Sequence, residues 1–442
     1  MKKFLFIILP SPSHYHASFS FAQKLKEEGN EICYVGTPHL EDTVVKEGFE
    51  FIHWHYTTEY KIQTIKAFFG VLLKSLFDKT FLAVSKMDYS KNIEDVRSLI
   101  RESNADQIFL DEHLSEYYLY FKELEVRTSI LCTKISSRKS VGIPPMDSYF
   151  IPSNSIISKL YCEFLWQLKN LNDSIKMLIH KVAFCGNDEY SFLREYCSTQ
   201  GIDLKSTLDS KNYYYPSIIG LERVILGSRG FDYPWRAVLP TENYELYEIN
   251  RNEEKYKLSL YIEFLAELKK PKNKNKYLLY FSFGTVTYKD ENRVQLLLDK
   301  IIEIVKQRKD LLLVISKSNY IHEPFSHERI YTFQYLPQLH LLSFADLMIT
   351  HGGHNSIKEC IQKGVKMLVF PHMENNDQPG NAARVQFGEH GLMGKVENDS
   401  IVTIATKIDK LLSSNKLKLR KNEDLDEPIN GNNYSVFDQI TK

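Results

Sequence analysis

The chain has 442 residues, enough for two domains of roughly 200 residues each. Its 56 basic and 56 acidic residues give a net charge of zero, which excludes the strongly basic character of proteins that bind nucleic acids through charge. The six cysteines include no Cys-x-x-Cys pair, a pattern typical of reduced thiols in a cytoplasmic protein and not of a disulfide framework.

The N-terminus combines two lysines with an apolar run over residues 4–9, as a secretory signal peptide does. The run is short and no small-residue cleavage site follows, so we predict a first buried strand there. No stretch approaches about 20 uninterrupted apolar residues, which predicts no transmembrane helix. Residues 68–77 are apolar except for Lys74. We favour a core helix there over a surface-binding helix, and peripheral membrane contact stays an open alternative.

Strand-like and helix-like patterns alternate in both halves of the chain. In the first half, the predicted strands are residues 4–9, 31–35, 49–53, 107–110 and 129–132, and the predicted helices are residues 17–28, 62–77 and 81–102. In the second half, the predicted strands are residues 277–281, 311–316, 330–335, 347–349 and 366–370, and the predicted helices are residues 294–307, 378–388 and 401–412. This alternation predicts an α/β fold with parallel, doubly wound sheets.

An aromatic-rich, amphipathic helical pattern covers residues 156–179, after a loop rich in Pro, Gly and Ser. We favour packing of this helix against the first sheet over the alternative that it walls an apolar pocket. Its apolar positions include Leu160, Phe164, Leu165, Leu168 and Leu171.

Residues 346–359 (DLMITHGGHNSIKE) combine a buried strand, a glycine turn and a helix start. The paired glycines allow a tight turn and a close approach of the backbone to a ligand. Asn355 and Ser356 are the expected N-cap residues of the helix. Unpaired amides and the positive dipole end at a helix N-terminus bind anions, and His351 adds a donor beside them. We predict a phosphate site here.

Two polar residues follow strands of the first half. His14 comes after the first predicted strand, and Asp111 ends the fourth. Ligands of open parallel sheets bind at the carboxyl ends of strands. There a histidine can act as a general base, and a carboxylate can fix its tautomer and stabilise its protonated form. Taken alone, His14 is more simply a structural residue and Asp111 a helix cap, and His16 competes with His14 for the role of base.

Two further turns in the second half carry polar residues. Residues 282–285, which end in Thr285, could set amides and hydroxyls against a phosphate, although such turns are common. Asp377 and Gln378 lie between a strand and a helix. They could bind vicinal hydroxyls, or simply cap the helix.

In order along the chain, these pieces resemble the nucleotide-sugar-dependent glycosyltransferase family that includes plant glucosyltransferases, animal glucuronosyltransferases and bacterial macrolide glycosyltransferases. Three motifs carry the resemblance: residues 335–338 (YLPQ), 349–359 (ITHGGHNSIKE) and 377–385 (DQPGNAARV). Residues 10–14 (PSPSH) and 231–234 (FDYP) also agree with the family pattern. The resemblance spans most of the chain and is weakest between residues 57 and 226.

The resemblance implies two facing Rossmann-like domains, the GT-B fold, with the active site between them. Residues 1–240 would form an acceptor-binding domain, and residues 241–275 a linker. Residues 276–414 would form the nucleotide-sugar-binding domain, followed by a tail, residues 415–442, that could return to the first domain as a helix.

The resemblance also implies roles for individual residues. His14 would be the catalytic base and Asp111 its partner. The donor site would hold the nucleotide through Tyr335, Gln338 and Glu359, the diphosphate through Thr285, His351, Gly353, Asn355 and Ser356, and the transferred sugar through Asp377 and Gln378.

The chemistry that follows is direct displacement of a nucleoside diphosphate by an acceptor hydroxyl, which predicts inversion at the anomeric carbon. The helix N-terminus after Gly353 would stabilise the departing diphosphate, so we expect no metal and no cofactor besides a UDP- or dTDP-sugar co-substrate. We further expect a hexose as the transferred group, a small apolar acceptor such as a natural product or lipid-like molecule, no nucleic-acid partner, and a monomer or homodimer.

Departures from the family keep alternatives open. Ser13 and Ala17 replace a glycine and a proline that are frequent around the catalytic histidine, and residues 372–376 are additional to most members. One alternative is a non-catalytic nucleotide-sugar-binding or helper protein on the same fold, which the pairing of a histidine with a carboxylate disfavours. Others are a GT-B enzyme acting on lipid or cell-wall acceptors, and an epimerase. The least favoured is a metal-dependent hydrolase that uses His14, His16, His351 and His354.

Overall fold

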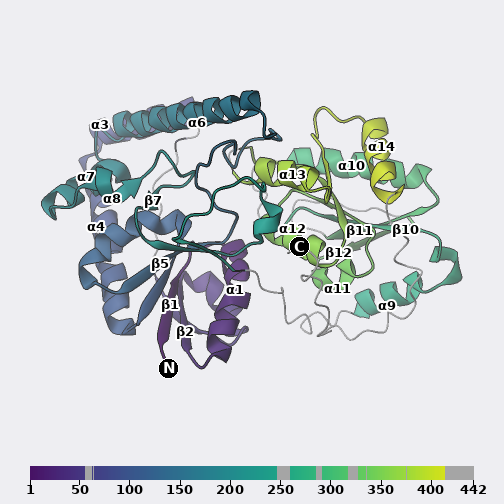
Figure 1. Ribbon diagram of the computed structural model, residues 1–442, viewed down its shortest axis with the longest axis horizontal. Coiled ribbons are helices and arrows are strands. Elements are labelled where there is room, and N and C mark those ends of the chain that lie inside the picture. Colours follow the sequence, from purple (N-terminus) through teal and green to yellow (C-terminus); the bar gives the residue numbers. More distant parts are fainter. Residues whose placement is uncertain are drawn as a thin grey trace. The chain divides into compact units, whose positions relative to one another are not determined.

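Two parallel sheets, each flanked by helices, organise the chain into two compact units in the computed structural model (Figure 1). The structure describes residues 1–54, 62, 64–245, 259–284, 291–316, 327–334, 336–374 and 376–413. Unit 1 comprises the described residues of Met1–Pro145, Pro152–Arg229 and Trp235–Tyr247, and unit 2 those of Met146–Ile151, Gly230–Pro234 and Glu248–Lys442.

The seven-stranded sheet of unit 1 is parallel throughout. Its order is β3 (Glu50–His53), β2 (Glu31–Gly36), β1 (Lys3–Ile7), β4 (Gln107–Asp111), β5 (Arg127–Cys132), β8 (Glu222–Ile225) and β9 (Glu242–Tyr244). Side chains of β1 alternate between its two faces. Phe4 and Phe6 pack with aromatic residues of α1 (Pro12–Glu27), while Leu5 and Ile7 pack on the face that α4 (Lys79–Ser103) covers.

The remaining elements of unit 1 surround this sheet. The helices are α2 (Glu41–Val45), α3 (Ile65–Phe77), the short η2 (Glu112–Tyr117), α5 (Tyr118–Phe121), α6 (Ile156–Ala183), α7 (Glu189–Thr199) and α8 (Leu204–Thr207). Strands β6 (Leu208–Asp209) and β7 (Ser217–Ile218) form a small antiparallel pair.

The six-stranded sheet of unit 2 is also parallel. Its order is β12 (Ile330–Phe333), β11 (Leu311–Ser316), β10 (Tyr277–Ser282), β13 (Leu347–Thr350), β14 (Lys366–Val369) and β15 (Gly391–Met393). One face packs against α10 (Glu291–Gln307) and α14 (Ile401–Ser413) in a continuous apolar core. The other described helices are α9 (Ser259–Leu268), α11 (Gln338–Leu342), α12 (His354–Gln362) and α13 (Gln378–Phe387).

Each sheet has one point at which the strand order reverses direction. In unit 1 this point lies between β1 and β4, and in unit 2 between β10 and β13. Loops that leave such neighbouring strands run to opposite sides of the sheet, which opens a crevice at the carboxyl ends where ligands bind. The candidate site residue His14 follows β1, Asp111 ends β4, and His351 follows β13.

The predicted α/β fold with two Rossmann-like domains is confirmed. Two local predictions are wrong. Helix α1 begins at Pro12, so His14 lies in its first turn and not on a loop. A proline is tolerated at the first helical position because the backbone N–H that it lacks would have no hydrogen-bond partner within the helix there. Helix α12 has Gly353 as its N-cap, so Asn355 and Ser356 lie inside its first turn.

The domain boundaries set out above stay predictions, but two short segments within residues 1–240 lie in unit 2. The segment Gly230–Pro234 is held there by a buried ion pair between Asp232 and Arg384 of α13, whose Oδ1 and Nε atoms are 2.9 Å apart. The segment Met146–Ile151 is held by a backbone hydrogen bond from Gly380 to Met146. The tail, residues 415–442, lies outside the described residues.

The prediction that α3 and α6 bury their apolar faces is wrong. Leu160, Phe164, Leu168 and Leu171 of α6 are exposed, and the buried side of that helix carries residues such as Cys162 and Trp166. Hydrophobic periodicity reports that a helix is amphipathic, but both faces of α6 carry large apolar side chains, so the pattern did not indicate which face packs inward. In the described part of the chain, no helix is long and apolar enough to cross a membrane.

Candidate active site

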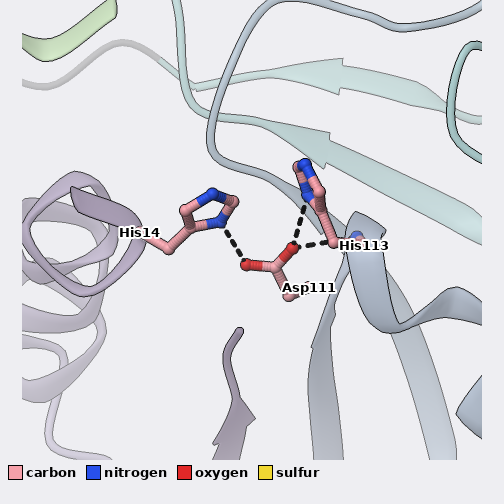
Figure 2. A group of neighbouring side chains, drawn as sticks. All are labelled: His14, Asp111 and His113. Atoms are coloured by element: carbon pink, nitrogen blue, oxygen red, sulfur yellow. Dashed lines mark hydrogen bonds and ion pairs between the residues drawn. The ribbon is translucent and has the colours of Figure 1, made fainter. Parts of the chain in front are cut away.

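His14 and Asp111 meet at the reversal point of the unit 1 sheet. The His14 Nδ1 and Asp111 Oδ2 atoms are 2.7 Å apart, and both side chains are buried (Figure 2). Asp111 is the last residue of β4, and the first turn of α1 carries His14 to the neighbouring position. The predicted pairing of these two residues is thus present. His16 is exposed on the same helix and takes no part in it.

Asp111 is a fully buried carboxylate whose two oxygens serve different partners. Oδ2 accepts from His14, while Oδ1 accepts from the backbone N–H of His113 at 2.9 Å and lies 3.1 Å from His113 Nδ1. The helix-cap interpretation of Asp111 therefore also holds, because that backbone contact caps η2. Burial by itself would raise the pKa of Asp111, but the charge of His14 and the hydrogen bonds from His113 and His14 outweigh it and lower that pKa well below its usual value.

This geometry selects one tautomer of His14. A carboxylate that is ionised can only accept, so His14 Nδ1 carries the proton that points at Asp111. The other ring nitrogen, Nε2, then carries a lone pair and can take a proton from a substrate. The hydroxyl of Thr133, just after β5, lies 3.1 Å from His14 Nδ1 and adds a second polar contact on the same side of the ring.

His113 is a site residue that the sequence analysis missed. Its ring lies 4.7 Å from the His14 ring, edge to face, and 3.9 Å from the ring of Tyr215. Burial lowers the pKa of His113, although its hydrogen bond to Asp111 opposes this. The signal that could have found it is its position two residues after a strand-end aspartate, where its ring turns back toward that carboxylate.

Within the described residues, His14, Asp111 and His113 form a group that could hold a metal ion, since their donor atoms lie within 4.8 Å of one another. In the structure both Nδ1 atoms face the carboxylate as hydrogen-bond partners. The set that the hydrolase alternative needs is not brought together in unit 1, because His14 is buried and His16 points outward from α1.

In unit 2, His351 lies at the end of β13 between two glycines. A Cβ atom on Gly284 would lie 3.0 Å from the ring, and one on Gly353 would lie 2.6 Å from its Nε2. The second distance is shorter than real Cβ contacts allow, so Gly353 is required for the His351 ring to sit against the start of α12. The predicted phosphate site thus has its histidine beside a helix N-terminus whose N-cap makes no side-chain hydrogen bond.

His351 is held neutral. Its Nδ1 is buried and makes no hydrogen bond with any described residue. Burial, and after it the nearby His372, lower the pKa of His351 to about 3, against a smaller opposing effect of Asp377. The rings of His351 and His372 are 5.4 Å apart, and Phe283 lies 6.0 Å from each. A neutral imidazole at this position can donate one hydrogen bond to an anion without carrying charge into the site.

The neutral state of His351 predicts a pH dependence of stability. The unfolded chain protonates this histidine near pH 6.5 but the folded chain only near pH 3, so stability falls as the pH is lowered between these values, by at most about 1.4 kcal/mol per pH unit. His351→Gln removes this contribution. As the pH is lowered from 6.5 to 4.5, the urea unfolding midpoint of the wild type should therefore fall toward that of the variant, and the difference between the two midpoints should shrink. The matched control is His16→Gln, at an exposed position, which should track the wild type. A constant gap between His351→Gln and the wild type would contradict the assignment.

The candidate nucleotide residues form a polar network at the start of α11 and in α12. The Tyr280 hydroxyl donates to Gln338 Oε1 at 2.9 Å, and Gln338 Nε2 donates to Glu359 Oε2 and, at 3.4 Å, approaches Ser356 Oγ. Glu359 is fully buried. The structure therefore brings Gln338, Ser356 and Glu359 together. Tyr335 and Thr285 lie outside the described residues.

Asp377 and Gln378 are both buried at the start of α13, and neither acts as a simple helix cap. Asp377 Oδ2 accepts from Asn381 Nδ2 at 2.8 Å, and Asn381 also donates to the carbonyl of Gly352 at 2.9 Å. Gln378 Oε1 accepts the backbone N–H groups of His372 and Met373, each at 3.0 Å. Gln378 thus fixes two of the additional residues after β14, His372 and Met373, through its amide oxygen.

Comparison with known proteins gives independent evidence on the fold and the family resemblance. Residues 288–430 match the model of the glycosyltransferase family 28 C-terminal domain. A glycosyltransferase of kitacinnamycin superposes with a TM-score of 0.65 at 15% identity, over 96% of this chain and 94% of that one, which is evidence for the fold. The chain has the GT-B glycosyltransferase fold. The resemblance to nucleotide-sugar-dependent glycosyltransferases inferred from the motifs is confirmed.

The curated relatives of this GT-B chain match over shorter stretches. An uncharacterized UDP-glucosyltransferase, YdhE of Bacillus subtilis (strain 168), is 33% identical over 120 residues, 25% of this chain and 27% of the relative. Human UDP-glucuronosyltransferase 3A2 is 36% identical over 86 residues, 19% of this chain and 16% of the relative. The matched stretches thus span about a quarter or less of the relatives' length.

Proposed function

We propose that the protein is an inverting, metal-independent glycosyltransferase of the cytoplasm, which moves a hexose from a UDP- or dTDP-sugar to a hydroxyl of a small, apolar acceptor. The observation that carries this proposal is the buried pair of His14 and Asp111, with Nδ1 and Oδ2 2.7 Å apart, at the reversal point of a parallel sheet. The relatives named for UDP-glucosyl and UDP-glucuronosyl transfer support the choice of donor.

The reaction begins at the acceptor hydroxyl, which is a weak nucleophile while it keeps its proton. His14 Nε2 accepts that proton as the hydroxyl oxygen forms a bond to the anomeric carbon. The bond from that carbon to the diphosphate breaks, and its electron pair leaves with the nucleoside diphosphate. Asp111 stabilises the imidazolium that forms, because its ionised carboxylate already faces His14 Nδ1. Attack opposite to the leaving group inverts the anomeric centre.

Unit 2 would hold the donor and accept the developing negative charge. The N-terminus of α12, with its positive dipole end, and the neutral imidazole of His351 suit a diphosphate. Gln338, Ser356 and Glu359 are joined in one network and could bind a ribose as a unit. Asp377 and the amide nitrogen of Gln378 remain our candidates for the hexose hydroxyls, and Thr285, Tyr335, Gly353 and Asn355 keep the roles that the motifs imply.

Metal independence gives a direct prediction. Transfer activity should be unchanged after treatment with EDTA and dialysis, because the donors of unit 2 and the His14–Asp111 pair supply the required charge stabilisation. The measurement is the rate of nucleoside diphosphate release before and after chelation. Loss of activity on chelation, with recovery on adding Zn²⁺, would instead indicate that His14, Asp111 and His113 act as metal ligands.

The test of the function as a whole is binding and turnover of a panel of UDP- and dTDP-hexoses with generic phenolic acceptors. Calorimetry should detect binding of at least one donor, and a coupled assay should detect acceptor-dependent release of its nucleoside diphosphate. Donor binding without release under any acceptor would favour a non-catalytic binding protein. Absence of binding by every nucleotide sugar would defeat the proposal.

A further inference from the structure

Helices α3 and α6 of unit 1 expose an unusual amount of apolar surface. Of the 27 large apolar side chains exposed in the described part of the chain, five belong to α3 and twelve to α6, so these two helices account for most of them. Phe77 is 82% exposed and Ile157 is 81% exposed. Scattered exposed apolar residues are ordinary, but a dense set on two helices marks an interaction surface.

On α6 the exposed apolar residues form one stripe along the helix. Six of them recur at intervals of three, four or seven residues, the spacing of one helical face. Representative members are Ile157, Leu160, Phe164, Leu171, Ile175 and Leu178. The buried residues Ser158, Cys162 and Trp166 lie on the opposite side, and Trp166 Nε1 donates to the carbonyl of Ile143. The helix is therefore anchored by one face and presents an apolar stripe roughly 32 Å long on the other.

Helix α3 repeats this arrangement beside one end of α6 (Figure 1). Its exposed apolar residues Ile65, Phe69, Leu73 and Leu76 also share one face, at intervals of four, four and three residues. Val71 of α3 is buried in a small cluster with Ala183 and Phe184 at the end of α6. We call the exposed apolar residues of these two helices the α3–α6 apolar face.

The charges beside this face are mainly positive. Helix α3 carries two exposed lysines, Lys66 and Lys74, and no acidic residue. Helix α6 carries two exposed lysines, Lys176 and Lys181, against Glu163 and Asp173, while Lys159 is half-buried and the Lys169 side chain is only 7% exposed. Both acids are already paired: Glu163 with Lys139 at 2.6 Å, and Asp173 with Lys169 at 3.0 Å. The two helices are thus net positive in a chain whose net charge is zero.

We propose that the α3–α6 apolar face docks on the surface of an anionic lipid bilayer, with α6 lying in the plane of the interface. An apolar stripe flanked by lysines is the pattern of interfacial helices, whose apolar side chains enter the acyl boundary while their lysines reach anionic headgroups. A second copy of this chain fits less well. Lysine is depleted in protein–protein interfaces, and two identical positive faces repel each other.

Docking of this kind goes beyond sugar transfer. It would also bring unit 1, the proposed acceptor-binding unit, to a surface where apolar molecules concentrate; this consequence rests on the proposed function. The docking itself does not, and it can be measured without any substrate.

The test uses flotation of the full chain with two kinds of vesicle, phosphatidylcholine alone and phosphatidylcholine mixed with phosphatidylglycerol. We expect binding to the anionic vesicles, weaker binding to the neutral ones, and a decrease with rising salt. A variant with Leu160→Ser, Leu171→Ser and Leu178→Ser should lose at least about tenfold in the partition coefficient, since it removes apolar area from the stripe. These residues are exposed, so circular dichroism should report an unchanged fold.

The matched control removes three exposed apolar residues elsewhere, through Ile219→Ser, Leu296→Ser and Val402→Ser, and should bind vesicles like the wild type. Equal losses in both variants would overturn the proposal, as would failure of the wild-type chain to float with either vesicle. Light scattering after size exclusion distinguishes the other occupant. If the wild-type chain is a dimer that does not bind vesicles, and if the stripe variant is a monomer, the partner of this face is a second copy of the chain.

Discussion

Replacement of His14 by alanine should lower kcat by about 10²–10⁴-fold and leave donor affinity unchanged. In the proposed reaction the imidazole removes the acceptor proton through Nε2, because Nδ1 faces Asp111 at 2.7 Å. The candidate donor residues belong to unit 2 and share no partner with His14, so the dissociation constant of the nucleotide sugar should stay within about twofold of the wild-type value. Steady-state release of nucleoside diphosphate and calorimetry of donor binding are the two measurements.

The control for this change is His16→Ala on the same helix. His16 is exposed and takes no part in the pair with Asp111, so its replacement should leave kcat within about twofold of the wild type, in line with the small effects of surface substitutions. If His14→Ala keeps full activity, the base assignment is wrong. If His16→Ala loses as much as His14→Ala, the two histidines have been assigned in the wrong order.

Asp111→Asn should cost about a thousandfold or more in kcat, because an amide has only one accepting atom where the carboxylate has two. The Asp111 Oδ1 position accepts the backbone N–H of His113 at 2.9 Å, whereas the backbone N–H of Leu9 approaches the Oδ2 position only at 3.4 Å. The amide oxygen therefore takes that position and the amide NH₂ faces His14 Nδ1. His14 must then accept there, which moves its own proton to Nε2 and removes the lone pair that serves as the base.

The variant that isolates this effect is His113→Phe. It removes the ring nitrogen that lies 3.1 Å from Asp111 but keeps the backbone N–H and an aromatic ring against Tyr215. Its kcat should stay within about tenfold of the wild type, because Asp111 still presents Oδ2 to His14. A loss in His113→Phe as large as that in Asp111→Asn would show that the His113 side chain, and not the tautomer of His14, governs the rate.

The candidate site could be predicted best where its residues lie in the turns that follow buried strands. The glycine turn after β13 and the strand-end residues His14 and Asp111 could be found because parallel sheets expose their carboxyl ends to ligands, and because Gly353 has no substitute beside the His351 ring. The two reversal points confirm the reasoning that selected these edges. The strong motifs of the second half also predicted the fold that the structure has.

Features set by three-dimensional contacts were not predictable in this way. His113 reaches Asp111 through a local turn that leaves no separate pattern in the sequence, and the role of Gln378 in holding residues 372 and 373 depends on a loop conformation. The periodicity of α6 predicts an inward apolar face although the stripe faces outward, because the spacing is the same in either orientation. Which face packs is decided by Trp166 and its neighbours, and not by the stripe itself.

The configuration of the product shows whether the sugar is transferred by direct displacement at the anomeric carbon with His14 as base. Purified full-length protein, UDP-α-glucose or another α-linked donor that binds, and a simple phenol are incubated, and the anomeric proton of the isolated glycoside is examined by NMR. We expect a β-linked glycoside, formed by the wild type and lost with His14→Ala. An α-linked product would contradict direct displacement.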